Sequence, residues 1–121
     1  MNSEQLKDAV IIALEDMKAQ DITVLDIQDV ASFADYMVVV SGTSNTHVKA
    51  IAVNTAKDLS RQGVKALSEE GANVAEWVLL DFGDVIVHVM RPEVRDFYAL
   101  EKLWDQEVRK TLNANQSLES E

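Results

Sequence analysis

Apolar side chains recur at helical spacing in two stretches of the first half of the chain. Residues 3–20 carry them three and four positions apart on one side, with charged residues on the other, which predicts an amphipathic helix with Ser3 as its N-cap. Residues 43–61 begin with three candidate N-cap residues and continue with a second apolar stripe, and Gly63 follows as a typical helix-ending residue. Both segments are therefore predicted to be helices.

Three other stretches have the composition of strands. Residues 22–27 are rich in β-branched side chains, which favours a first strand. Residues 36–40 form an uninterrupted apolar run, which is typical of a strand that is covered on both faces in the middle of a sheet. Residues 64–68 predict a further short strand.

Residues 77–90 predict a β-hairpin, because Gly83-Asp84 suits the two-residue type II′ turn that joins adjacent strands. This turn fixes the pairing of the two strands. One face is then purely apolar, with the opposed pairs Phe82 and Val85, Leu80 and Val87, and Val78 and Val89. The other face is mixed, with the opposed pairs Trp77 and Met90, Leu79 and His88, and Asp81 and Ile86.

The last predicted element is a third helix that begins near Pro92 and has a kink near Tyr98 or Ala99. The order of elements is α, β, β, α, β, β, β, α, which predicts an α/β (α+β) fold with a mixed five-stranded sheet. Three short helices rarely cover both faces of five strands, so part of one face should stay open. We expect one domain over residues 1–112 and a disordered acidic tail over residues 113–121.

Composition and charge narrow the classes of function. The 121 residues are 47% hydrophobic, which is enough for one core, and the chain has no cysteine for disulfides or thiolate sites. The net charge of −10 repels phosphate backbones, so direct RNA contact is disfavoured. Residues 1–20 carry charges every few positions, unlike a signal peptide or a membrane span, so we expect a cytoplasmic protein without membrane contact.

The junction Ser41-Gly42-Thr43-Ser44 is one candidate for chemistry, because backbone amides at a helix N-terminus can hold an anion. The junction has neither the lysine of a P-loop nor a G-x-G-x-x-G pattern, and ordinary helix capping is the simpler interpretation. A nucleotidyltransferase would also need a D-x-D or D-x-E pair on the next strand to hold two metal ions, and that pair is missing. A nucleotidyl or phosphoryl transferase with an atypical site near Gly42 to Ser44 is kept as the alternative function.

The two histidines do not provide a metal-ligand motif or a catalytic group for a site near Gly42 to Ser44. His47, in the first turn of the second helix, and His88, in the middle of a strand, are too far apart in sequence to suggest a ligand motif. The chain also offers no thiol nucleophile. We therefore predict no catalytic residue, no metal ion and no cofactor.

The mixed face of the hairpin is the strongest candidate for function. Trp77 and Met90, with Tyr98 nearby, are residue types that concentrate binding energy, while Asp81 and His88 offer polar contacts. An acidic protein with such a face should prefer a basic protein surface. The alternative is that the C-terminal helix covers this face. An open apolar face would also make a weak homodimer reasonable.

Several motifs, taken in order, resemble the ribosomal silencing factor family, also called the Iojap family. Each motif alone is weak, but their order and spacing over Leu6 to Trp104 are specific. The motifs are Ala34-Asp35-Tyr36, Ser41-Gly42-Thr43-Ser44, His47-Val48, Ile51-Ala52, Glu70-Gly71, Trp77, Leu80-Asp81, Gly83-Asp84-Val85-Ile86-Val87-His88-Val89-Met90, Phe97-Tyr98 and Leu100-Glu101-Lys102-Leu103-Trp104.

The resemblance implies a nucleotidyltransferase-like fold without the metal-binding acids. It also implies a translational repressor and no enzyme: family members bind the large ribosomal subunit through its protein number fourteen and sterically block joining of the small subunit. In the family the docking surface lies on the sheet face and the C-terminal region. Carried over by motif, the expected partner-binding residues are Trp77, Leu79, Asp81, His88, Met90, Tyr98 and Leu100.

Overall fold

The computed structural model of the protein describes residues 1–72 and 75–98. Its elements follow the predicted order of helices and strands. They are α1 (Ser3–Asp16), β1 (Gln20–Asp26), β2 (Tyr36–Ser41), α2 (Asn45–Arg61), β3 (Ser68–Glu70), β4 (Trp77–Asp81), β5 (Val85–Met90) and α3 (Pro92–Tyr98).

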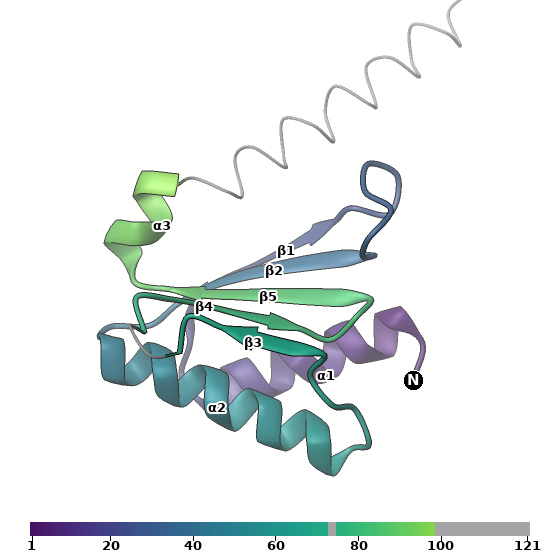
Figure 1. The fold of residues 1–121 in the computed structure, drawn as a ribbon, viewed down its shortest axis with the longest axis horizontal. Coiled ribbons are helices and arrows are strands. Elements are labelled where there is room, and N and C mark those ends of the chain that lie inside the picture. Colours follow the sequence, from purple (N-terminus) through teal and green to yellow (C-terminus); the bar gives the residue numbers. More distant parts are fainter. Residues whose placement is uncertain (73–74, 99–121) are drawn as a thin grey trace, which may run out of the picture.

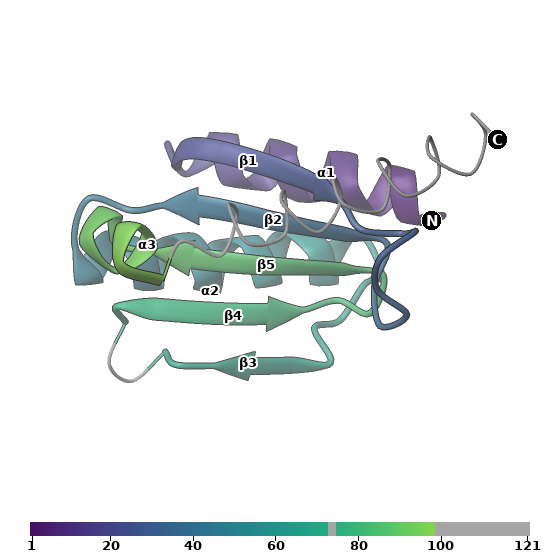
Figure 2. The same ribbon diagram turned by 90° about the horizontal axis from the view of Figure 1, so that it is seen from above.

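The strands form one five-stranded sheet in the order β1-β2-β5-β4-β3 (Figure 2). Only β2 and β5 are parallel, whereas the other neighbouring pairs are antiparallel, so the predicted mixed sheet is confirmed. Strand β2 lies between β1 and β5, and five of its six residues are buried, as its uninterrupted apolar run predicts. Strand β5 occupies the centre of the sheet.

Helices α1 and α2 both lie on one face of the sheet (Figure 1). Their apolar stripes pack against the inward side chains of β2, β4 and β5 and form the main core. Each valine, leucine or isoleucine that is fully buried there contributes roughly 1.5–3 kcal/mol. The helix-facing core residues of the sheet are Val38, Val40, Val78, Leu80, Phe82, Val85, Val87 and Val89.

The second face of the sheet carries a smaller cluster. The segment between β1 and β2 and the short helix α3 rise on this side, at opposite ends of the sheet (Figure 1). Within the described part of the chain, no long helix covers this face. The buried members of the cluster are Ile27, Ala34, Met37, Val39 and Met90, and the half-buried apolar residues packed against it are Leu25, Val30, Ala31, Trp77, Ile86 and Val94.

The ends of the two long helices are set by side-chain caps. Asn2, not the predicted Ser3, is the N-cap of α1, and its side chain accepts a hydrogen bond of 2.8 Å from the Gln5 backbone N–H. The Gln5 side chain accepts 3.1 Å from the Asn2 N–H and completes a capping box. A capping box needs a Glu or Gln three residues after the N-cap. Gln5 stands at that distance from Asn2, which favours Asn2 over Ser3 as the N-cap. At α2 the cap is Ser44, one of the three predicted candidates.

Two predicted boundaries differ from the structure by four residues, and the others by two or fewer. Helix α1 ends at Asp16, because Lys18 takes a left-handed backbone conformation with φ of 57°. The strand predicted over residues 64–68 lies at Ser68–Glu70 instead. Val64 still bonds back to the Leu59 carbonyl at the end of α2, so ladder pairing with β4 starts later. The predicted kink, at the end of α3, and the predicted tail extend outside the described residues.

Candidate docking surface

The predicted register of the hairpin is confirmed along its whole length. Trp77 pairs with Met90, Leu79 with His88, and Asp81 with Ile86, so these six residues share the second face of the sheet. Gly83 has φ of +90°, as the first position of a type II′ turn requires. The Asp81 carboxylate accepts 2.8 Å from the Gly83 N–H and thereby stabilises the turn.

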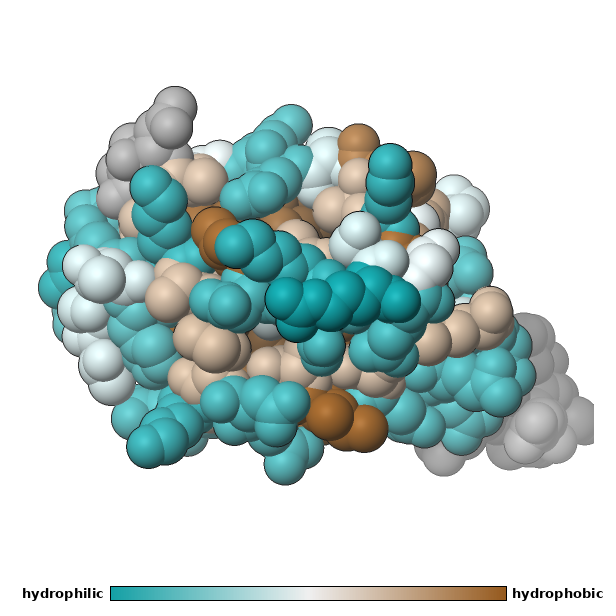
Figure 3. All heavy atoms as spheres, turned by 90° about the horizontal axis from the view of Figure 1, so that it is seen from below, coloured by the Kyte–Doolittle hydropathy of each residue, from teal (hydrophilic) through white to brown (hydrophobic). Residues whose placement is uncertain are grey.

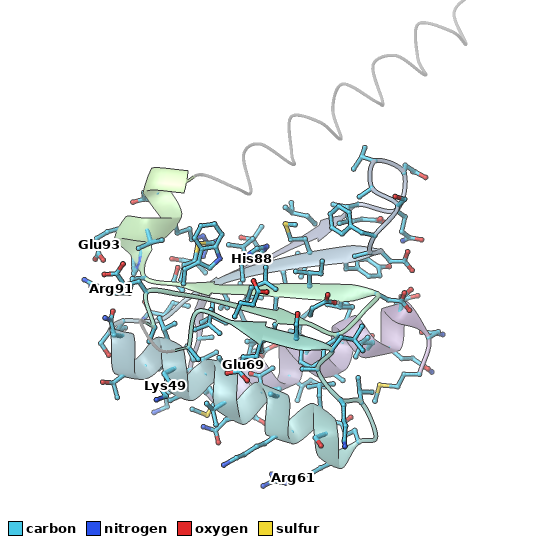
Figure 4. All side chains as sticks on the ribbon, viewed as in Figure 1. Lys49, Arg61, Glu69, His88, Arg91 and Glu93 are labelled. Carbon is cyan, nitrogen blue, oxygen red and sulfur yellow. The ribbon has the colours of Figure 1, made fainter. Side chains whose placement is uncertain are left out.

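Trp77 and His88 are joined by a hydrogen bond within this face. The indole Nε1–H donates to Nδ1 of His88 over 2.9 Å, and the ring centroids lie 5.7 Å apart at an interplanar angle of 52°. His88 lies on the side of the sheet opposite Lys49 and Arg61 of α2 (Figure 4). Burial lowers the pKa of His88 from 6.5 to about 4, because the charged imidazolium loses its hydration there. His88 is therefore neutral at neutral pH.

The side chains of the mixed face differ in exposure. Trp77, Leu79, Asp81 and Ile86 are half-buried. Met90 is fully buried and His88 is only 6% exposed, so the expectation that the whole mixed face is open is wrong for these two residues. Neighbouring side chains explain the burial, because Met90 packs in one cluster with Trp77 and Val94 of α3, and the Trp77 ring contacts His88. The described part of this face therefore presents Trp77, Leu79, Asp81 and Ile86.

A hollow lies beside the indole at the β3 edge of the sheet. Glu70, Gly71, Trp77 and Leu79 line it. Gly71 has φ of +90°, and a Cβ atom there would collide with the Trp77 carbonyl oxygen, so the close approach of the two backbones requires glycine. The hollow combines the half-buried apolar side chains of β4 with an exposed carboxylate at Glu70.

Helix α3 is fastened to the far end of the sheet by a buried arginine that sequence reasoning missed. Arg95 is 7% exposed and donates to the Ser41 hydroxyl of β2 over 3.0 Å and to the Thr23 hydroxyl of β1 over 2.8 Å. In the sequence Arg95 is one of eleven scattered basic residues, and no pattern distinguishes it from them. The predicted Tyr98 side chain and Leu100 lie outside the described part of the chain.

Thr43 and Ser44 of the strand-to-helix junction form hydrogen bonds with His47 inside the protein. The Ser44 hydroxyl accepts 3.1 Å from the His47 N–H, and the Thr43 N–H donates to His47 Nδ1 over 2.9 Å. The other ring nitrogen, Nε2, donates to the Met17 carbonyl over 2.9 Å and ties α2 to the end of α1. These bonds support the capping interpretation of this junction. Among the described residues, no three acidic or histidine side chains are grouped to hold a metal ion.

The outer surface of the two long helices differs in character from the sheet face. Figure 3 shows it as largely hydrophilic, with scattered hydrophobic residues. Ile12 of α1, which is 60% exposed, is one of the few large apolar side chains exposed on the helices. Within residues 1–72 and 75–98, no helix is long and apolar enough to cross a bilayer.

Comparisons with known proteins agree on one family. The family described as ribosomal silencing factor during starvation matches residues 1–121. A ribosomal silencing factor of Chromobacterium violaceum is 44% identical over 104 residues, covering 86% of this chain and 85% of that protein. The mouse mitochondrial assembly of ribosomal large subunit protein 1 is 35% identical over 100 residues, covering 80% of this chain and 44% of the mouse protein. A crystal structure of a C. violaceum protein, 44% identical, has a TM-score of 0.85 and covers 87% of this chain and 88% of that chain.

Proposed function

Because this chain belongs to the ribosomal silencing factor family, we propose that it represses translation by binding the large ribosomal subunit and sterically blocking the small subunit. The family match over all 121 residues carries the proposal. The name of the mouse relative, which refers to assembly of the ribosomal large subunit, supports the large subunit as the partner. The proposed place of action is the cytoplasm, where these ribosomes are found.

We propose that docking uses the second face of the sheet. Trp77 and Leu79 supply half-buried apolar surface beside the hollow at the β3 edge. Large side chains in such a position typically dominate a protein interface, each being worth about 2 kcal/mol or more. His88 and Met90 support this surface from below, because both are buried. Asp81 of the same face belongs to the proposed set, and Tyr98 and Leu100 from the C-terminal region complete it.

The proposed partner on the subunit is its protein number fourteen. The net charge of −10 favours a basic protein surface and speeds encounter with it, whereas it opposes close contact with the phosphates of ribosomal RNA. The exposed carboxylate of Glu70, which pairs with Leu79 across β3 and β4, lines the hollow beside Trp77 on the proposed surface. This charge distribution fits a cationic protein partner.

The proposed mechanism requires only that the protein binds the large subunit at the right position, and it involves no chemical step. A protein bound on the intersubunit side occupies space that the small subunit needs. The degree of repression therefore depends on the affinity of the protein for the large subunit. The alternative of a nucleotidyl or phosphoryl transferase gains no support from the junction at Gly42 to Ser44, where Thr43 and Ser44 serve as structural hydrogen-bond partners of His47.

Cosedimentation with separated ribosomal subunits tests the proposal. Wild-type protein should pellet with large subunits and not with small ones. Trp77→Ala should weaken this binding by about 2 kcal/mol, or roughly thirtyfold. Ile12→Ala is the matched control, because it also removes a large apolar side chain but from the exposed side of α1. Its binding should equal that of the wild type.

Two outcomes contradict the proposal at different levels. Absence of wild-type protein from the large-subunit pellet would reject the partner. Equal loss of binding in the Trp77→Ala and Ile12→Ala proteins, with both still folded, would reject the sheet face as the docking surface.

A further inference from the structure

Trp77 and His88 form a diagonal pair across β4 and β5. Trp77 is opposite Met90 and Leu79 is opposite His88, so the two rings are two residues apart in register. Diagonal neighbours on one face of a hairpin are within reach of aromatic side chains. Here they meet through a hydrogen bond of 2.9 Å from the indole Nε1–H to Nδ1.

This hydrogen bond determines the state of the imidazole. An indole N–H can only donate, so Nδ1 of His88 must be the unprotonated acceptor. The ring is then neutral and carries its proton on Nε2. Burial of His88 favours the same neutral form, because it penalises the imidazolium.

We propose that His88 is a positioning residue, which holds the Trp77 indole in place and so forms the docking surface before the partner arrives. The docking part rests on the proposed function, whereas the anchoring part does not. Immobilising a free side chain during binding reduces affinity, and a side chain that is already held avoids this loss. Because the indole N–H is satisfied inside the protein, the partner meets the apolar ring of Trp77 and need not supply an acceptor.

Two substitutions at position 88 separate anchoring from packing. His88→Asn keeps an acceptor, because the Asn Oδ1 atom occupies nearly the place of the His Nδ1 atom and can accept from the indole. His88→Leu introduces an apolar side chain of similar size and removes the hydrogen-bond acceptor for the indole. Ile51→Val is the stability control, because Ile51 is fully buried in the core on the other face of the sheet.

The indole N–H proton provides a direct readout of anchoring. In two-dimensional NMR spectra of 15N-labelled protein, the Trp77 signal is identified by its absence from the Trp77→Phe variant. We expect slow solvent exchange of this proton in the wild-type and His88→Asn proteins. In His88→Leu the signal should move and exchange at least about tenfold faster, since a broken hydrogen bond no longer protects it. In Ile51→Val the signal should stay in place.

Binding to purified large subunits is then measured for the same proteins. His88→Leu should bind about fivefold more weakly than the wild type, which is the effect of leaving one large side chain to be ordered on binding. His88→Asn and Ile51→Val should bind within about twofold of the wild type.

Each outcome has a separate meaning. An unchanged indole signal in His88→Leu would overturn the anchoring role. A changed signal with wild-type affinity would overturn the role of anchoring in docking. Failure of wild-type protein to bind large subunits would instead reject the proposed function and with it the docking role, while the NMR result would still decide whether His88 anchors Trp77.

Discussion

The burial of His88 predicts a specific loss of stability in mild acid. Its pKa is lowered from 6.5 to about 4 in the folded protein, because the charged ring loses its hydration. Between these two values the unfolded chain binds a proton at this residue and the folded protein does not. The stability linked to His88 is therefore fully present above about pH 6.5 and is lost as the pH falls towards about pH 4.

The size of the effect follows from the shift. Lowering the pKa of His88 from 6.5 to about 4 corresponds to about 3 kcal/mol of stability over the whole range, of which about 2 kcal/mol is lost between about pH 7 and about pH 5. This is a substantial part of the stability of a small domain, which is typically about 5–15 kcal/mol.

Urea denaturation at several pH values measures this loss, and His88→Asn supplies the comparison. Asparagine does not titrate, so the free energy of unfolding of this variant should fall by about 2 kcal/mol less than that of the wild type over the same pH range. Every other residue is common to both proteins, so the difference between the two profiles isolates position 88. Parallel pH profiles for the two proteins would refute the claim that His88 is buried in its neutral form.

Three further substitutions test local features by urea denaturation. Thr55→Val should leave the free energy of unfolding unchanged or raise it by up to about 1 kcal/mol, since the buried Thr55 hydroxyl has no hydrogen-bond partner among the described residues; a clear loss of stability would contradict this. Ser44→Ala should lower stability by about 1 kcal/mol, because it removes the cap of α2, and no change would show that the cap is dispensable. Gly71→Ala should lower stability by more than about 1 kcal/mol through the collision with the Trp77 carbonyl and the positive φ, and a wild-type value would mean that the β3 loop can readjust.

The hairpin was predictable because local rules determine it. A glycine at the first turn position and alternating side chains fix the register. The structure has five of the six predicted pairs in its strand register, and at the sixth the Phe82 N–H donates to the Val85 carbonyl. The uninterrupted apolar run of β2 likewise predicts a strand covered on both faces. These features depend on neighbouring residues, which the sequence displays directly.

Burial on the second face was less predictable, because it depends on residues distant in sequence. Met90 and His88 belong to the mixed face by alternation, but they are buried by side chains from other elements, Met90 with Val94 of α3 and His88 against the Trp77 ring of β4. Arg95 is a stronger case, because it reaches Ser41 and Thr23 across gaps of 54 and 72 residues. Alternation and helical spacing describe one element at a time and cannot identify such a contact.

Subunit joining, followed by light scattering, tests the central claim most directly. Purified large subunits are first incubated with excess protein and then mixed with small subunits, and the rise in scattering reports joined ribosomes. Wild-type protein should lower the extent of joining in a concentration-dependent way, and Trp77→Ala should need roughly thirtyfold more protein for the same effect. Full joining at concentrations of wild-type protein that saturate the large subunit would contradict repression by steric blocking.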